Sequence, residues 1–180
     1  YNVKNLLAAV AVGINFGVER RAICHALENY QPTNNRSQLV ETARNRLIVD
    51  AYNANPTSMM AALENFTAIE QQPNSQISTP NSQLSTLNSQ LKKMLILGDM
   101  RELGADSAKE HQLLVDIIAQ TGISDVWLVG SEFGKTDCPF RKFPTVDDVK
   151  AELQQNPLAG RLILVKGSNG TRLYELPSLL

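Results

Sequence analysis

The sequence predicts an α/β fold: a Rossmann-like, mostly parallel sheet with helices on both faces. Three short segments, residues 94–97, 125–129 and 161–165, are apolar except for Asp125 and Arg161 at their first positions, and they alternate with amphipathic segments of helical spacing. Strands that are apolar at every position are typical of parallel sheets covered on both sides. A chain of 180 residues has room for one such domain and a smaller second piece.

The composition excludes several classes of function. Lys and Arg total 17 and Asp and Glu total 18, for a net charge of −1, so the chain lacks the basic surface of nucleic-acid-binding or membrane-binding proteins. The two histidines and two cysteines match no common zinc-binding spacing. Two distant cysteines are no disulfide framework either, which indicates a cytoplasmic protein.

Two helices are expected at the start of the chain, joined at Gly17. The apolar run at residues 6–12 is far shorter than the roughly 20 residues that span a bilayer. A secretory signal is the alternative, since Lys4 precedes the run, but the run has minimal length and leads directly into a second amphipathic segment at residues 19–30. Two short helices are therefore the better prediction.

A hairpin and a helix should follow. Residues 37–42 and 46–51 predict two strands, because a short polar segment separates them. Asn55 and Pro56 predict the start of a helix. The side chain of Asn can cap a free backbone N–H, and Pro suits the first helical position, where no N–H is required.

Residues 71–92 predict a flexible insertion. The tripeptide Asn-Ser-Gln recurs with a period of seven, at residues 74, 81 and 88. A coiled coil needs a continuous apolar seam and tolerates no proline such as Pro80. The repeats are polar and uncharged, so they bury too little apolar surface to become ordered.

Helix caps are predicted in the second half of the chain. Ser107 with Glu110 has the spacing of a capping box at the start of a helix over residues 107–120, and Thr145 is placed to cap a helix that runs to residue 153. Ligand-binding loops of parallel sheets lie at the carboxyl ends of the strands. This rule selects residues 50–55, 98–104, 130–136 and 166–170.

The polar residues of these loops leave two interpretations open. Residues 98–104, Gly-Asp-Met-Arg-Glu-Leu-Gly, and residues 166–170, Lys-Gly-Ser-Asn-Gly, suit either an anion-binding rim or solvated turns. Gly134-Lys135-Thr136 lacks the spacing of a phosphate-binding loop. His111 shares helical spacing with apolar residues, which indicates a structural histidine rather than a catalytic one.

Four segments together resemble the C-terminal part of the Mur ligase family. They are Tyr-Asn-Val-Lys-Asn-Leu-Leu-Ala-Ala at residue 1, Asp-Ala-Tyr-Asn-Ala-Asn-Pro-Thr-Ser-Met at residue 50, Gly-Asp-Met-Arg-Glu-Leu-Gly at residue 98 followed by His111, and Leu-Val-Lys-Gly-Ser at residue 164. The second and third favour the members that join D-alanyl-D-alanine to UDP-N-acetylmuramoyl-tripeptide in peptidoglycan synthesis.

The resemblance implies a multidomain enzyme. Residues 1–34 would be the last helices of its central ATPase domain, and residues 35–180 its C-terminal Rossmann-like domain. ATP and Mg²⁺ would be bound mainly by the central domain, which with the N-terminal domain would be the partner of this chain. ATP would phosphorylate the tripeptide carboxylate, and the amine of D-alanyl-D-alanine would attack the acyl phosphate. The resemblance assigns no catalytic residue to this fragment, which is expected to be inactive alone.

The resemblance also implies site residues. The nucleotide side of the site would comprise Arg36, Asp50, Tyr52, Asn53 and Asn55, with Asp50 accepting the ribose hydroxyls.

The incoming dipeptide would be bound by Lys166 and Ser168, and Asp99 and Glu102 would belong to a loop between domains. Two alternatives stay open. One is a sibling Mur or folate polyglutamate ligase, which uses the same chemistry on a different amino acid. The other is a non-catalytic nucleotide-binding module.

Overall fold

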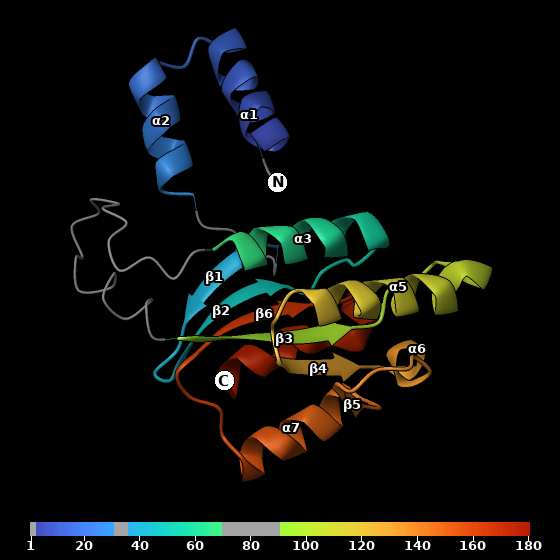
Figure 1. Ribbon diagram of the computed structural model, residues 1–180. Coiled ribbons are helices and arrows are strands. Elements are labelled where there is room, and N and C mark those ends of the chain that lie inside the picture. Colours follow the sequence, from blue (N-terminus) through green and yellow to red (C-terminus); the bar gives the residue numbers. More distant parts are fainter. Residues whose placement is uncertain (1–2, 31–35, 70–90) are drawn as a thin grey trace. The chain divides into compact units, whose positions relative to one another are not determined.

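The computed structural model describes residues 3–30, 36–69 and 91–180 (Figure 1). The chain divides into two compact units, Tyr1–Thr33 and Asn34–Leu180. The predicted insertion lies outside the described residues apart from its last two positions, and of these Lys92 already belongs to a strand. Within the described ranges, no helix is both long enough and apolar enough to span a membrane.

The first unit is a helical hairpin of α1 (Val3–Asn15) and α2 (Arg20–Glu28). Gly17 turns the chain with a φ of +73°, in the left-handed region where glycine ends helices at little cost. Among residues 3–30, Ile23 alone is buried, and it packs so closely on α1 that a Cβ at Gly13 would lie 2.9 Å from its Cδ1 atom. The two predicted helices are confirmed.

The second unit is built on a six-stranded sheet with the order β1-β2-β6-β3-β4-β5. Only β1 is antiparallel to its neighbour. The fold class predicted from the sequence is thereby confirmed, including the hairpin of the first two strands. The strands are β1 (Gln38–Glu41), β2 (Asn45–Asp50), β3 (Lys92–Gly98), β4 (Asp125–Val129), β5 (Arg141–Phe143) and β6 (Arg161–Lys166).

Helices cover both faces of this sheet (Figure 1). In β3, Leu95 and Leu97 face the apolar cluster formed with α3 and α5, whereas Met94 and Ile96 face the cluster formed with α7 and the C-terminal turns. Both faces are thus buried, which explains why the strands are apolar at successive positions. The helices are α3 (Pro56–Ala68), α5 (Ser107–Gln120), α6 (Ser131–Gly134) and α7 (Val146–Gln155), with 3₁₀ turns η1 (Gly104–Asp106), η2 (Asn169–Thr171) and η3 (Leu173–Ser178).

Two of the three predicted caps are confirmed. The side chain of Asn55 accepts a hydrogen bond from the backbone N–H of Ser58 at 2.8 Å, and Thr145 forms a reciprocal capping box with Asp148. The cap predicted at Ser107 is wrong. The 3₁₀ turn η1 runs directly into α5, so Ser107 already has helical φ and ψ angles, and its hydroxyl donates to Glu132 instead.

An ion cluster between α7 and η3 makes the stability of this unit depend on pH. Hydrogen bonds from Arg172 and Lys150 lower the pKa of Glu175 from its ordinary value of 4.5 to about 2. Because the folded-state pKa is the lower one, the stabilisation is fully present above the ordinary value of 4.5 and is lost as the pH falls toward 2.

We expect the Glu175→Gln variant to be less stable than the parent above pH 5, with a difference that shrinks between about pH 4.5 and pH 2. Urea unfolding at a series of pH values, followed by the fluorescence of the single tryptophan, Trp127, measures this difference. The same comparison in an Arg172→Met background should show a weaker pH dependence. A difference that stays constant with pH would contradict the expectation.

Candidate functional site

The carboxyl ends of β2, β6 and β3 lie side by side, because β6 is inserted between the other two strands. Asp50 at the end of β2 is the register partner of Lys166 at the end of β6, and Lys166 in turn pairs with Leu97 of β3. The loops that follow these three strands therefore share one edge of the sheet. They contain most of the residues that the sequence predicts as a site.

A buried ion pair lies at the centre of this edge. The Nζ atom of Lys166 is 2.5 Å from Oδ2 of Asp50, and it also donates to the carbonyl oxygen of Asn53 at 3.2 Å. Lys166 is 1% exposed and Asp50 6% exposed. The other carboxylate oxygen of Asp50 accepts the backbone N–H of Ser37 at 3.4 Å. The structure thus joins two residues that the sequence assigns to different ligands.

The other predicted nucleotide residues lie around this pair. The guanidinium of Arg36 stacks 4.0 Å from the ring centre of Tyr52, a cation–π contact on a ring that is 48% exposed. Asn53 and Asn55 are exposed. The side chain of Asn55 is the helix cap of α3, so its role in the structure is local.

Ser168 connects three loops of the edge and is nearly buried. Its backbone N–H donates to the carbonyl of Asp99 at 3.2 Å, and its hydroxyl oxygen accepts the backbone N–H of Arg101 at 3.0 Å. The same hydroxyl donates to the carbonyl of Ala54 at 3.5 Å. Ser168 therefore ties the loop after β6 to the loops after β2 and β3.

The carboxylate of Asp99 accepts the first backbone N–H groups of α6. Glu132 and Phe133 donate to it at 3.0 and 2.9 Å. Gly130 makes this approach possible, since a Cβ there would lie 2.3 Å from the Asp99 carboxyl carbon. Glu102 is exposed and has a φ of +66°, a left-handed conformation that is rare for a non-glycine residue and is found disproportionately at functional sites.

His111 holds the loop after β3 from beneath. It is fully buried; its Nε2 atom accepts the backbone N–H of Met100 at 3.0 Å, and Nδ1 lies 2.7 Å from the carbonyl oxygen of Ser107. These contacts place the ring proton on Nδ1. The burial and the backbone contacts of His111 support the prediction of a structural histidine.

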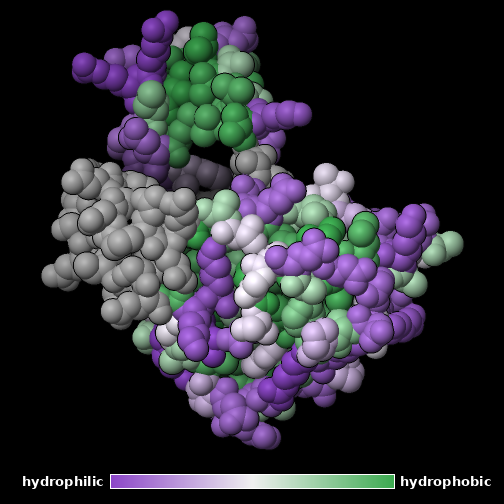
Figure 2. Space-filling view, in the orientation of Figure 1, coloured by the Kyte–Doolittle hydropathy of each residue, from purple (hydrophilic) through white to green (hydrophobic). Residues whose placement is uncertain are grey.

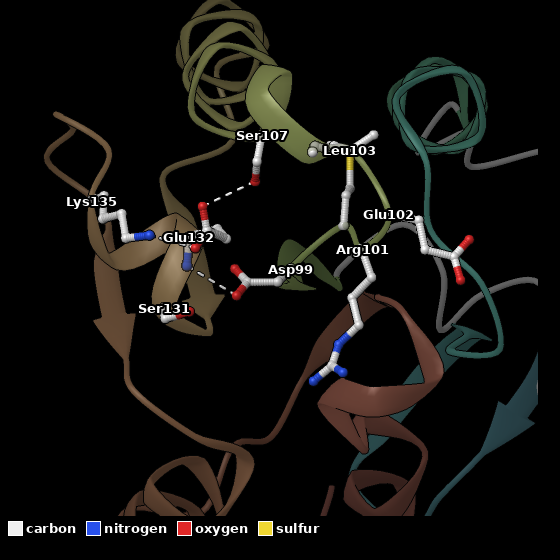
Figure 3. Close-up of a pocket in the computed structure, with 10 residues that line it drawn as sticks. Asp99, Arg101, Glu102, Leu103, Ser107, Ser131, Glu132 and Lys135 are labelled. Atoms are coloured by element: carbon white, nitrogen blue, oxygen red, sulfur yellow. Dashed lines mark hydrogen bonds and ion pairs between the residues drawn. The ribbon is translucent and has the colours of Figure 1, made fainter.

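An open cavity of about 720 Å³ lies between this loop and α6. Arg101, Glu102, Glu132 and Lys135 bring charges of both signs to its wall. Figure 3 shows Asp99, Ser107 and Lys135 converging on the Glu132 segment, whereas Glu102 points away from them.

Arg101 and Lys135 are not among the site residues predicted from the sequence. A single cation between two carboxylates at the end of a buried strand is the signal that points to Arg101. Lys135 lies in the segment 130–136 that the strand-end rule selects, but only the packing of α6 brings its side chain to the wall of the cavity.

Comparisons with known proteins agree on one group. No family model matches the chain. The UDP-N-acetylmuramoyl-tripeptide–D-alanyl-D-alanine ligase of Bacillus subtilis is 30% identical over 188 residues, which cover 98% of this chain and 37% of the relative. The ligase of the same name from Treponema pallidum is 29% identical over the whole chain and 37% of its own length.

Solved structures give the same result. A crystal structure of MurF from Acinetobacter baumannii superposes with a TM-score of 0.72 at 27% identity, over 98% of this chain and 37% of that one. MurF of Thermotoga maritima, solved in complex with ADP, shares the fold with a TM-score of 0.66 at 18% identity. The chain spans about 37% of the length of the first curated relatives it matches. By sequence and by fold, this chain is therefore similar to a part of the UDP-N-acetylmuramoyl-tripeptide–D-alanyl-D-alanine ligases.

Proposed function

We propose that this chain is the C-terminal part of an ATP-dependent ligase that joins D-alanyl-D-alanine to UDP-N-acetylmuramoyl-tripeptide. The match to ligases of this name over 98% of the chain carries the proposal. The shared edge of β2, β6 and β3 supports it, because ligands of open α/β sheets bind at the carboxyl ends of the strands. The chain would supply one wall of an interdomain site.

In the proposed reaction, the terminal phosphoryl group of ATP is transferred to the tripeptide carboxylate, which releases ADP. The amine of the dipeptide then attacks the acyl carbon, an amide bond forms, and phosphate leaves. Mg²⁺ would neutralise charge on the transferring phosphoryl group. Among the described residues, no three His, Cys, Asp or Glu side chains are grouped as metal ligands, and we assign no magnesium ligand to this chain.

The contribution of this chain would be positioning. At the nucleotide end, the proposal places Arg36, Asp50 and Tyr52 beside the ribose and phosphates, with Asn53 and Asn55 on the same turn. The stacking of Arg36 on Tyr52 supports this, because it holds a cation beside the Asp50 segment. A positioned cation stabilises phosphate charge without reorganisation during the reaction.

At the other end, we propose that the loop after β6, with Ser168, lies beside the incoming dipeptide. The loop with Asp99 and Glu102 would lie at the junction with the rest of the enzyme. D-alanyl-D-alanine has one amine and one carboxylate. The mixed charges around the cavity, with Arg101 and Lys135 opposite in sign to Glu102 and Glu132, are compatible with such a zwitterion.

The helical unit would be the end of the central ATPase domain in a cytoplasmic enzyme. None of the residues of α1 is buried, and large apolar side chains are exposed on this unit (Figure 2). Exposed apolar surface of this kind marks contact sites. In the complete enzyme, the remainder of the central domain would cover it. The exposed side chains include Leu6, Leu7, Val12, Ile14 and Phe16.

The test is an assay of the complete natural protein that contains these residues. Ligation that depends on ATP should occur with D-alanyl-D-alanine and not with meso-diaminopimelate or glutamate. Activity with either of the other acceptors would identify a sibling ligase. Nucleotide binding with no ligation of any acceptor would identify a binding module.

The 180-residue chain alone is expected to hydrolyse no ATP and to bind it weakly, because it would hold only one wall of the site. Phosphate release and isothermal titration measure the two properties. Turnover of ATP by this chain would contradict the assignment of the catalytic machinery to other parts of the enzyme. The Lys93→Gln variant, changed at the opposite end of β3, should behave like the parent in both measurements.

A further inference from the structure

We propose that Lys166 is a positioning residue for the nucleotide end of the site, acting through Asp50 rather than on the incoming dipeptide. The inference rests on the proposed function, because it takes Asp50 as the residue that accepts the ribose hydroxyls. What it adds is a role for a buried lysine.

The pairing of Lys166 with Asp50 is built into the sheet. The two residues are register partners on neighbouring parallel strands, so their side chains point to the same face. On β6, Ile163 and Val165 belong to the apolar cluster on the opposite face, and Leu164 to the cluster beneath α3 and α5. Lys166 therefore lies on the same face of β6 as Leu164, and the side chain next to it on that face is Asp50 of β2.

The surroundings of Lys166 leave little access for a ligand. The residue is 1% exposed, and its ammonium group has Asp50 at 2.5 Å and the carbonyl oxygen of Asn53 at 3.2 Å. Two of its three N–H groups are used by these acceptors, and at 1% exposure a substrate carboxylate could approach the third only by disturbing the buried ion pair. Separating such a pair leaves an uncompensated charge in the interior, which is strongly unfavourable. The ammonium group is thus committed to Asp50.

The carboxylate of Asp50, in contrast, keeps capacity for a ligand. Within residues 3–30, 36–69 and 91–180, Lys166 contacts Oδ2 and the Ser37 N–H contacts Oδ1, one partner on each oxygen. Each carboxylate oxygen accepts about two hydrogen bonds, so one position on each remains for the two hydroxyls of a ribose. With its rotation already restricted by Lys166, the carboxylate loses little conformational freedom when the ligand binds.

Lys166 also orders the turn that follows Asp50. Its bond to the carbonyl of Asn53 fixes the backbone on which Tyr52 stands, and Tyr52 carries the stacked Arg36. The buried ammonium group of Lys166 thus links Asp50 to the turn that carries the stacked pair of Arg36 and Tyr52. Ser168, which ties the loops after β2, β3 and β6 together, does not contact this group in the hydrogen bonds of the described residues.

A double-mutant cycle in the complete natural protein tests the proposal. Lys166→Gln removes the charge but keeps a donor, and Asp50→Asn removes its partner. We expect each single variant to raise the KM for ATP about 3- to 10-fold, the effect of losing one or two hydrogen bonds. The double variant should match Asp50→Asn alone, because Lys166 acts through Asp50. The KM for D-alanyl-D-alanine should stay within about 2-fold throughout.

Three results would overturn the inference: a rise in the KM for the dipeptide alone, additive effects of the two changes on the KM for ATP, or no effect of Lys166→Gln. If Lys166→Gln does not fold, the comparison of Asp50→Asn with the double variant still decides, since the double variant has neither buried charge. The Lys93→Gln variant, changed at a partly buried lysine at the far end of the sheet, controls for the loss of a lysine. A parent enzyme without ligase activity would overturn the proposed function itself.

Discussion

Replacing Lys166 with methionine should lower the free energy of unfolding of the Asn34–Leu180 unit by about 3–5 kcal/mol. The substitution preserves much of the side-chain volume, so little of this loss comes from a cavity. It comes from Asp50, which is 6% exposed and would retain a charge without its ammonium partner at 2.5 Å. Such a loss is a large part of the 5–15 kcal/mol that stabilises a typical domain.

Urea unfolding followed by Trp127 fluorescence measures this change, because the single tryptophan lies in β4 of the same unit. Adding Asp50→Asn to Lys166→Met should recover about half of the loss, since the uncompensated charge is then removed. The control Lys93→Met should cost at most about 1 kcal/mol, the value of one backbone hydrogen bond. Equal losses for Lys93→Met and Lys166→Met would show that burial of the ion pair is not the cause.

Gly130→Ala should cost about 3–5 kcal/mol, through strain and overpacking together. Gly130 has φ and ψ of 124° and 169°, a backbone conformation open essentially to glycine alone. An alanine Cβ would also lie 2.3 Å from the carboxyl carbon of Asp99. Asp99 would have to move, and the N–H groups of α6 would lose their acceptor.

The matched control is Gly122→Ala. Gly122 also has a positive φ, +77°, but in the described part of the chain no atom beyond its two sequence neighbours lies within 4 Å of the position of its Cβ. This variant should therefore cost only about 1–2 kcal/mol from backbone strain. The difference between the two variants measures the contact with Asp99. Combining Gly130→Ala with Asp99→Ala should therefore add less than the sum of the two single changes. Equal losses at Gly122 and Gly130 would exclude the contact as a cause.

The elements of the fold were predictable where their signals are local. Asn55 with Ser58 and Thr145 with Asp148 satisfy free N–H groups of a helix start within four residues, and Pro56 has no N–H to satisfy, so the sequence alone specifies these starts. Ser107 has the same spacing to Glu110 and fails as a cap, because the preceding 3₁₀ turn continues into the helix. Whether a potential cap is used depends on how the chain enters the helix.

The candidate site was only partly predictable. The rule that loops at strand ends bind ligands selects the segments that form the candidate site, but it does not say which of them are in contact. Asp99 and His111 were recognisable as polar groups near a loop, yet their partners are the backbone N–H groups of α6 and of Met100. Backbone donors leave no trace in residue identity, so the roles of these side chains follow from the packing.

The sequence by itself determined the class of fold, the local caps and turns, and the resemblance to a ligase family, since these depend on residue type and short spacing. The tertiary structure alone decided that Lys166 pairs with Asp50, 116 residues earlier in the chain. The crossover through α7 inserts β6 between β2 and β3, and the register of that insertion places the two residues side by side. Strand order and register are set by packing of both sheet faces, a property of the whole unit and of no single segment.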